Sequence, residues 1–189
     1  MTVMATPGDV HRPYTVADLE TMPDDGRRYE LIDGELLVSP APGWPHQEAV
    51  YALHRVLRDA CSRELRVVGA PFAVRPDAFN EYQPDVLVAR QTDLTLEDLP
   101  RAPVLAVEVI SPTSGIRDAS LKKAVYARMG VPSYWLVDPN VQQPSLTVFE
   151  LDGAEYRQVA HVVGDEAFAA EHPYPVRVGP ADLVAGLRP

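Results

Sequence analysis

The sequence predicts an α/β fold with a mixed β-sheet flanked by helices. Three observations lead to this class: an apolar, β-branched run at residues 104–110, a helical stretch after it that stops at Gly130, and a second β-rich run at residues 133–137. Such an apolar run is typical of a strand buried on both faces. A strand, a helix and a strand in succession fit a right-handed crossover between parallel neighbours.

Composition favours an ordinary globular protein. Of 189 residues, 46% are hydrophobic and 23% are charged, which excludes disorder and a membrane protein as classes. We expect residues 1–13 to be a loose tail and residues 14–189 to be a single domain. No apolar run approaches the roughly 18 residues of a membrane span, and the N-terminus lacks the apolar core of a signal peptide.

Charge and cysteine content exclude further classes of protein. Cys61 is the only cysteine, so an intrachain disulfide and a CxxC zinc site are both excluded. These features predict a cytoplasmic protein. The net charge of −10 counts against nonspecific coating of DNA, which needs a basic face. It does not exclude a nuclease, because a clustered acidic metal site itself contributes negative charge.

The N-terminal part predicts a short helix and a hairpin. Thr15 is a plausible N-cap of the helix, which would end by Pro23. The pair Asp33-Gly34 lies between two apolar-rich runs, which is typical of a type I′ β-hairpin. Glu30 and Glu35 flank this turn and fit exposed strand positions, although Glu30 could instead approach a site.

Residues 46–63 predict an amphipathic helix after a proline- and glycine-rich loop. Its apolar stripe runs at three- and four-residue spacings through Val50, Leu53, Leu57 and Cys61. A thiol on such a stripe is inert by default. A histidine on an apolar face is usually a packing residue, which is how we interpret His54. His46 lies at the start of the helix and could instead approach a functional site.

Strands and turns alternate in the middle of the chain. Residues 65–74 predict a strand with an irregularity at 69–71, residues 80–83 a polar approach, and residues 86–89 a buried strand entered through Pro84. Residues 94–100 fit a helical turn or loop, and residues 111–115 a turn cluster. The next helix would open at Asp118 or Ser120 and run to Met129.

The C-terminal third predicts a second hairpin, a short strand and an apolar end. Asp152-Gly153 separates two strand-like runs at residues 146–150 and 155–163. Residues 174–178 fit a final strand, and residues 181–187 form a short apolar segment. Three aromatic residues are expected to be exposed and could either pack on the protein or contact a partner: Trp44, Tyr82 and Trp135.

Glu108 is the first candidate for a functional residue, because it is the one charged residue within the apolar run at residues 104–110. A carboxylate in a buried strand costs several kcal/mol unless a cation, a metal or hydrogen-bond donors meet it. Asp85 heads another buried strand. Helical geometry puts Lys122 at the rim of the apolar face of its helix and Lys123 nearly opposite, toward water. Two acids and a lysine at the ends of regular elements are the layout of a divalent-metal phosphodiester site.

A purely structural interpretation of Lys122 competes with its assignment to a metal site. Asp118 lies four residues earlier, and an i, i+4 ion pair on the helix surface is worth only a few tenths of a kcal/mol. A nucleophilic hydrolase is disfavoured, because the sequence has no GxSxG motif.

Several motifs together resemble a known family. The stretches YELIDGELLVSPAP followed by a histidine, then QPDVLV, then VEVISPTS with a later lysine, tyrosine and GVPSYWLVDP are similar to the Uma-type restriction endonuclease family. Pro84-Asp85 with Glu108 on the next buried strand resembles the wider PD-(D/E)XK nuclease superfamily. The resemblance spans about residues 29–139 and implies a restriction-endonuclease-like core with a metal site at one sheet edge.

The resemblance also implies roles for individual residues. Asp85 and Glu108 would be the metal carboxylates, with Mg²⁺ as the metal and Mn²⁺ as a substitute. The superfamily's usual Glu-x-Lys would put lysine at position 110, where this chain has Ile110. In the Uma-type pattern the lysine is displaced to the following helix, which matches Lys122 with Tyr126 four residues on.

The resemblance further implies an additional acid near the site, Glu30, a DNA substrate and, by analogy with nucleases that cut two strands, a homodimer. Two hypotheses follow. The first is a Mg²⁺-dependent endonuclease that cuts DNA with Asp85, Glu108 and Lys122. The second is a non-catalytic binding or assembly module with a degenerate nuclease fold, in which these residues form a buried ion-pair network.

Overall fold

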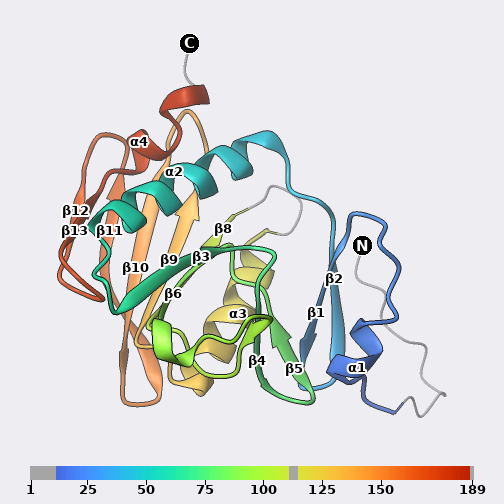
Figure 1. Ribbon diagram of the computed structural model, residues 1–189. Helices are drawn as coiled ribbons and strands as arrows, with labels where there is room; N and C mark the ends of the chain where they lie inside the picture. Colours follow the sequence, from blue (N-terminus) through green and yellow to red (C-terminus); the bar gives the residue numbers. More distant parts are fainter. Residues whose placement is uncertain (1–11, 111–114, 188–189) are drawn as a thin grey trace.

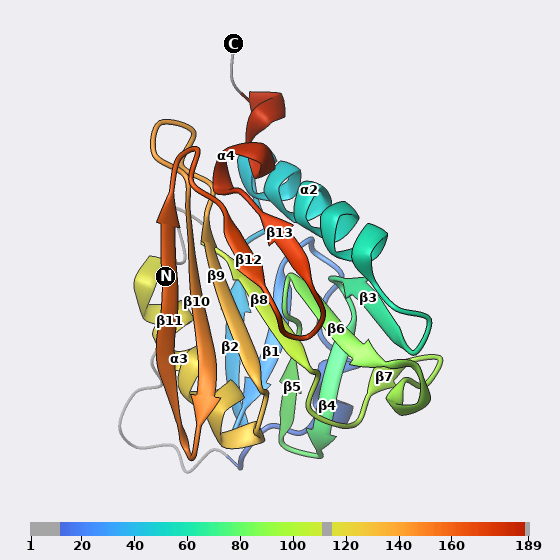
Figure 2. The same ribbon diagram turned by 90° about the vertical axis from the view of Figure 1, so that its left-hand side faces the viewer.

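The computed structural model describes residues 12–110 and 115–187, without the side chains of residues 115–118. The expected tail therefore lies almost wholly outside the described residues, as do residues 111–114 of the expected turn cluster. A six-stranded sheet forms the centre of the fold, with one long helix on each face (Figure 1 and Figure 2). A five-stranded sheet packs beside it, and a two-stranded ribbon completes the set within the described ranges.

The central sheet is mixed, as predicted. Its strand order is β11-β10-β9-β8-β6-β3. Only β8 and β9 run parallel, connected through α3 as the crossover predicts, while the other neighbours are antiparallel. The strands are β3 (Leu65–Gly69), β6 (Val86–Arg90), β8 (Leu105–Val109), β9 (Ser133–Asp138), β10 (Ser145–Asp152) and β11 (Glu155–Val163).

The five-stranded sheet was not expected. Its order is β2-β1-β5-β4-β7, from β1 (Arg28–Ile32), β2 (Glu35–Ser39), β4 (Ala73–Asp77), β5 (Asn80–Tyr82) and β7 (Asp98–Leu99). The polar approach at residues 80–83 is thus largely a strand, and the expected loop at 94–100 contains another. The I′ hairpin is confirmed, because φ is positive at both Asp33 (53°) and Gly34 (80°).

The helices start and end close to their predicted positions. They are α1 (Val16–Leu19), α2 (Trp44–Ala60), α3 (Gly115–Met129) and α4 (Pro180–Leu183), with 3₁₀ turns η1 (Gln91–Asp93) and η2 (Ala185–Leu187). Thr15 caps α1 and Gly130, with φ +81°, ends α3, both as predicted. Across the described residues, none of these helices has the length and apolarity that a membrane crossing requires.

Three helix boundaries differ from the predictions. The helix α2 begins at Trp44 rather than at residue 46, because Pro45 fits the first helical turn, where its missing N–H is not needed. It stops at Ala60 with Cys61 as the C-cap. The helix α3 begins at Gly115, before both predicted openings, which the turn-rich composition of residues 111–115 had concealed.

Strand alternation divides the core into two clusters. Leu105, Val107 and Val109 of β8 pack on the side of α2, together with α4 and the ribbon of β12 (Phe168–Ala170) and β13 (Val176–Val178). Ala106 packs on the other side, against α3 and the five-stranded sheet. Glu108 has the same parity as Ala106, so the strand directs it toward this second side.

Burial corrects three expectations from the sequence. Trp44 is 67% exposed as expected, but Tyr82 and Trp135 are buried in the two clusters. Helical periodicity puts Leu121, Ala124, Val125 and Met129 on the apolar face of α3; Leu121 and Ala124 are instead exposed, while Val125 is buried together with Tyr126. Lys123 does not simply point to water, since its ammonium lies 3.7 Å from the ring centroid of Phe149.

Candidate active site where the central strands meet α3

Strand register brings Asp85 and Glu108 together. In the antiparallel pair of β6 and β8, Val86 lies opposite Val107, so one further step along each strand places Asp85 opposite Glu108. The N–H of Val109 donates a hydrogen bond to Oδ2 of Asp85 at 2.9 Å. Both carboxylates are buried, Asp85 with 2% and Glu108 with 7% exposure. The structure therefore places the two predicted metal ligands side by side.

The helix α3 supplies a cation and a hydroxyl to Glu108. Lys122 and Tyr126, four residues apart, share one face of the helix. The Nζ of Lys122 lies 3.1 Å from Oε1 of Glu108, and the hydroxyl of Tyr126 donates to the same oxygen at 2.7 Å. Lys122 is buried, so the surface-pair interpretation is wrong. A lysine on the helix does reach the Glu108 carboxylate although position 110 holds isoleucine.

Glu30 joins this cluster from the second sheet. Its Oε1 lies 3.0 Å from Nζ of Lys122 and accepts a hydrogen bond from the backbone N–H of Gln83 at 2.7 Å. Its exposure is 1%, so the interpretation as an exposed strand position is wrong. The reason is that β1 lies between β2 and β5 and packs against the central sheet, which the sequence did not predict.

Two basic side chains hold Asp85. The Nε2 of His46, near the start of α2, lies 3.0 Å from Oδ2. The Nη2 of Arg28, on β1, lies 2.9 Å from Oδ1, and its Nη1 donates to the carbonyl of Gln83 at 3.1 Å. The approach of His46 fits the prediction. Arg28 was missed, although its spacing from Glu30 puts both on one face of a strand.

The side chain of His46 has a second, unusual feature. Its Nδ1 is buried without a hydrogen-bond partner among the described residues. Because an ionised carboxylate only accepts hydrogen bonds, Nε2 is the nitrogen that donates to Asp85. His46 thus orients Asp85 through one nitrogen only.

Burial and charge act differently on the two carboxyl groups. Burial raises the pKa of Asp85, but the hydrogen bond from His46 and the charge of Arg28 outweigh it and lower the value to about 2. Burial also raises the pKa of Glu108, and the nearby charges of Asp85 and Glu30 add to the effect. Its pKa reaches about 7 even though Lys122 and Tyr126 act in the opposite direction.

The cations of the site stay charged. Burial lowers the pKa of Lys122, but Glu108 and Glu30 more than compensate and raise it above its ordinary value. Burial raises the pKa of the Tyr126 hydroxyl, as does the charge of Glu108, so this hydroxyl acts as a neutral donor. The site thus contains three buried carboxyl groups, Glu30, Asp85 and Glu108, beside the ammonium of Lys122 and the guanidinium of Arg28.

The donor set fits a hard divalent cation. Asp85 and Glu108 offer carboxylate oxygen, and Mg²⁺ is commonly bound by one or two carboxylates with water in its other positions. Burial raises the pKa of Glu108, and the charges of Asp85 and Glu30 add to the effect; a bound cation would favour the ionised carboxylate again. No group of three or more His, Cys, Asp or Glu side chains in the described part of the chain is arranged as a ready-made metal cage.

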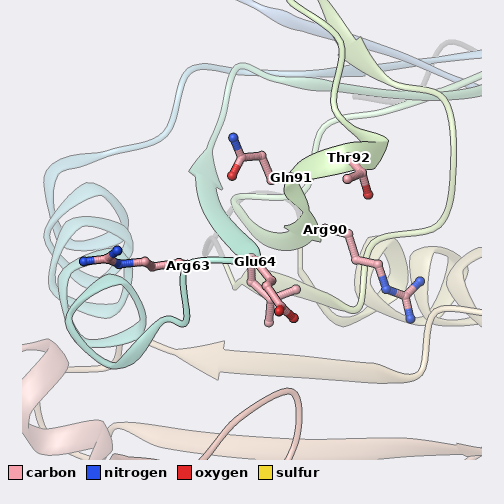
Figure 3. A pocket seen from close by; sticks show the side chains of 6 residues that line it. Arg63, Glu64, Arg90, Gln91 and Thr92 are labelled. Carbon is pink, nitrogen blue, oxygen red and sulfur yellow. The ribbon is translucent and has the colours of Figure 1, made fainter.

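A separate hollow lies at the opposite end of β6 from Asp85. It has a volume of about 640 Å³ and is lined by Arg63, Glu64, Leu65, Arg90, Gln91 and Thr92. In Figure 3 the side chains of Arg63 and Arg90 point away from each other. The hollow therefore does not bring the guanidinium groups of Arg63 and Arg90 together. None of the residues of the candidate active site lines it.

Comparison with known structures defines the class of this fold. The chain is similar to the crystal structure of "a putative nuclease belonging to DUF820" from Anabaena variabilis ATCC 29413, with a TM-score of 0.69 and 19% identity. The match covers 93% of this chain and 100% of the other. At this identity the likeness concerns the fold, which is a mixed α/β fold with a restriction-endonuclease-like core.

The family is defined by sequence. Residues 16–179 match the Uma2 family, described as "Putative restriction endonuclease", so the chain belongs to this family. No curated protein matches the chain. The matched range contains Glu30, Asp85, Glu108 and Lys122, all of which the resemblance in the sequence had singled out.

Proposed function

We propose that the protein is a Mg²⁺-dependent endonuclease that hydrolyses phosphodiester bonds in DNA, with Asp85, Glu108 and Lys122 as its catalytic residues. The observation that carries this proposal is the convergence of Lys122 with Glu108 and Glu30 from three separate segments, beside Asp85, in a buried cluster. Membership of the Uma2 family supports it.

Asp85 and Glu108 would hold the cation. When bound, Mg²⁺ would neutralise charge on the phosphate and lower the pKa of a bound water. His46, Arg28 and the N–H of Val109 orient Asp85, while Tyr126 orients Glu108. These contacts fix the direction of both carboxylates before a substrate arrives, which is what a preorganised site requires.

Lys122 would act on the phosphate. An ammonium has three N–H donors, and Glu30 and Glu108 account for two of them. A fixed cation of this kind stabilises the negative charge that develops on phosphoryl oxygens. In the hydrolysis, the water oxygen forms a bond to phosphorus, one P–O ester bond breaks, and the leaving oxygen takes a proton.

A non-catalytic binding module is the second candidate. Two observations favour it: Ile110 stands where the superfamily usually has lysine, and both oxygens of Asp85 already have partners within the chain. In that case the acids and Lys122 are a structural ion-pair network. Metal binding separates the two functions, because only the nuclease requires it.

A cleavage assay tests the nuclease directly. Supercoiled plasmid DNA with Mg²⁺ or Mn²⁺ should be nicked or linearised by the wild type. The variant Glu108→Gln should lose at least about 100-fold of the rate, comparable to removing one key electrostatic contact, while its circular dichroism stays native. Undiminished cleavage by this variant would refute the assignment. Cutting of both strands in one encounter would indicate a homodimer.

A further inference from the structure

Arg28 binds a carboxylate oxygen that a metal ion at this site would also need. Its Nη2 lies 2.9 Å from Oδ1 of Asp85, one of the two predicted metal ligands. The other oxygen, Oδ2, is engaged by His46 and by the N–H of Val109. Oδ1 is therefore the Asp85 oxygen whose partner is a long, flexible side chain rather than the backbone or a buried ring.

Arg28 is also more exposed than the other basic side chains described around Asp85. Its side chain is 20% exposed, compared with 8% for His46 and 7% for Lys122. A long side chain at the edge of a site can leave its partner more easily than one enclosed by the core. Its second contact, from Nη1 to the carbonyl of Gln83, is a single hydrogen bond at 3.1 Å.

Electrostatics makes Arg28 and a divalent cation alternatives. Both carry positive charge, and both gain from the same group of acids, Asp85, Glu30 and Glu108. Within a few ångströms and away from bulk water, two cations repel each other more strongly than they do in solvent. A metal ion therefore binds Asp85 most tightly when the guanidinium of Arg28 has moved away from it.

We propose that Arg28 is the resident counter-ion of Asp85, which competes with the divalent metal for this carboxylate and is released when the metal binds. The inference rests on the proposed function, because it concerns the same metal. It assigns Arg28 a positioning role: the guanidinium holds Oδ1 of Asp85 in place while no metal is bound. Once released, an arginine has the planar set of donors that suits phosphate.

The first test is the affinity for Mn²⁺, measured by calorimetry without DNA. Removing a competing cation should strengthen binding, so Arg28→Met should bind Mn²⁺ at least about tenfold more tightly than the wild type, or about 1.4 kcal/mol. Arg28→Lys keeps the charge and should stay near the wild type. Arg75→Met is the matched control, because Arg75 forms a comparable half-buried pair with Glu81, and its affinity should not change.

The second test follows the release in the unmodified protein. Phenylglyoxal reacts with accessible arginines, and mass spectrometry locates the adducts. Modification of Arg28 should be slow without metal and several-fold faster with Mn²⁺. Arg128 is 61% exposed and pairs with Asp33 at the surface, so its rate should be the same in both conditions.

The outcomes separate this inference from the proposed function. Tighter binding by Arg28→Met together with metal-accelerated modification of Arg28 supports the competition. Equal or weaker binding by Arg28→Met, with clear binding by the wild type, overturns it and leaves the metal site in place. Absence of binding in both proteins overturns the inference and the metal-dependent function together.

Discussion

Lys122 connects the acids of the site, since its ammonium lies 3.0 Å from Glu30 and 3.1 Å from Glu108. It is one of the few charged groups buried in the described part of this fold. An ion pair in such a place does not by itself stabilise a protein, because desolvation opposes the attraction between the charges. Removal of one partner does destabilise the protein, because the remaining charges are then buried without compensation.

Lys122→Met should therefore destabilise the protein. The change leaves Glu30 and Glu108 buried without their cation, and breaking such a pair costs about 3–5 kcal/mol. Urea denaturation followed by circular dichroism measures this free energy of unfolding. Lys123→Met is the control, because Lys123 lies over the ring of Phe149 and its loss should cost only about 1 kcal/mol. Equal losses in the two variants would contradict the central position of Lys122.

Glu108 should make stability depend on pH. Its pKa of about 7 in the folded protein exceeds the ordinary value of 4.5. The folded state then binds more protons than the unfolded state between these values, so the free energy of unfolding falls as pH rises from about 4.5 through 7, by about 3 kcal/mol at most. Glu108→Gln should remove this part of the pH dependence.

The measurement is urea denaturation at several pH values with EDTA present. The difference between wild type and Glu108→Gln isolates the one carboxyl group from all others that titrate. Glu35→Gln, an exposed position on β2, should leave the profile unchanged. A wild-type profile that is parallel to that of Glu108→Gln would show that Glu108 titrates normally.

Part of this residue-level picture could be predicted from the sequence. A single acid within an apolar run demands a partner wherever it folds, which pointed to Glu108 and its neighbours Asp85 and Lys122. The burial of Glu30 and the contact between Arg28 and Asp85 could not be predicted, because both depend on where β1 packs. That packing is a long-range property that local periodicity does not contain.

At the scale of elements, the hairpin of β1 and β2 positions Arg28 and Glu30 for the site. Its turn depends on Gly34, which has φ +80° and lies against Pro13. A Cβ added there would come within 2.6 Å of Cβ of Pro13 and 3.3 Å of the carbonyl of Tyr14. The turn is thus constrained both by its backbone conformation and by its neighbours.

Gly34→Ala should destabilise the protein more than the same change in the other hairpin. Gly153 has φ +65°, and a Cβ added to it would meet no other described atom within 4 Å. Gly153→Ala should cost about 1 kcal/mol for its left-handed conformation. Gly34→Ala should cost that amount plus the clash with Pro13, about 2–3 kcal/mol in total. Thermal or urea unfolding measures both, and equal costs would refute the role of the contact.

The elements differed in how well the sequence predicted them. The apolar run of β8, the hairpin strand β11 and both long helices have strong local patterns, and they were predicted within a few residues. The strands β5 and β7 have three and two residues, too few for an alternating pattern. β7 pairs with β4, and β5 pairs with β1 as well as with its chain neighbour β4, so the sheet that they join depends on partners distant in sequence.

At the scale of the whole molecule, the two sheets enclose the site between them. The central sheet contributes Asp85 and Glu108, the second sheet contributes Arg28 and Glu30, and α3 and α2 contribute the remaining groups. The fold class was predicted, but the second sheet was not, because a mixed sheet with flanking helices already accounted for the strongest patterns. With a net charge of −10, attraction to DNA would have to come from local groups and a bound cation rather than from a basic surface.

The most direct test of the central claim is calorimetric titration of the purified protein with Mn²⁺ and Mg²⁺, in the absence of DNA. Metal binding does not depend on the choice of DNA substrate, so it tests the site itself. The wild type should bind, and Asp85→Asn and Glu108→Gln should each weaken binding at least about tenfold while remaining folded. A folded wild type that binds neither metal would contradict the account and favour a structural ion-pair network in a non-catalytic module.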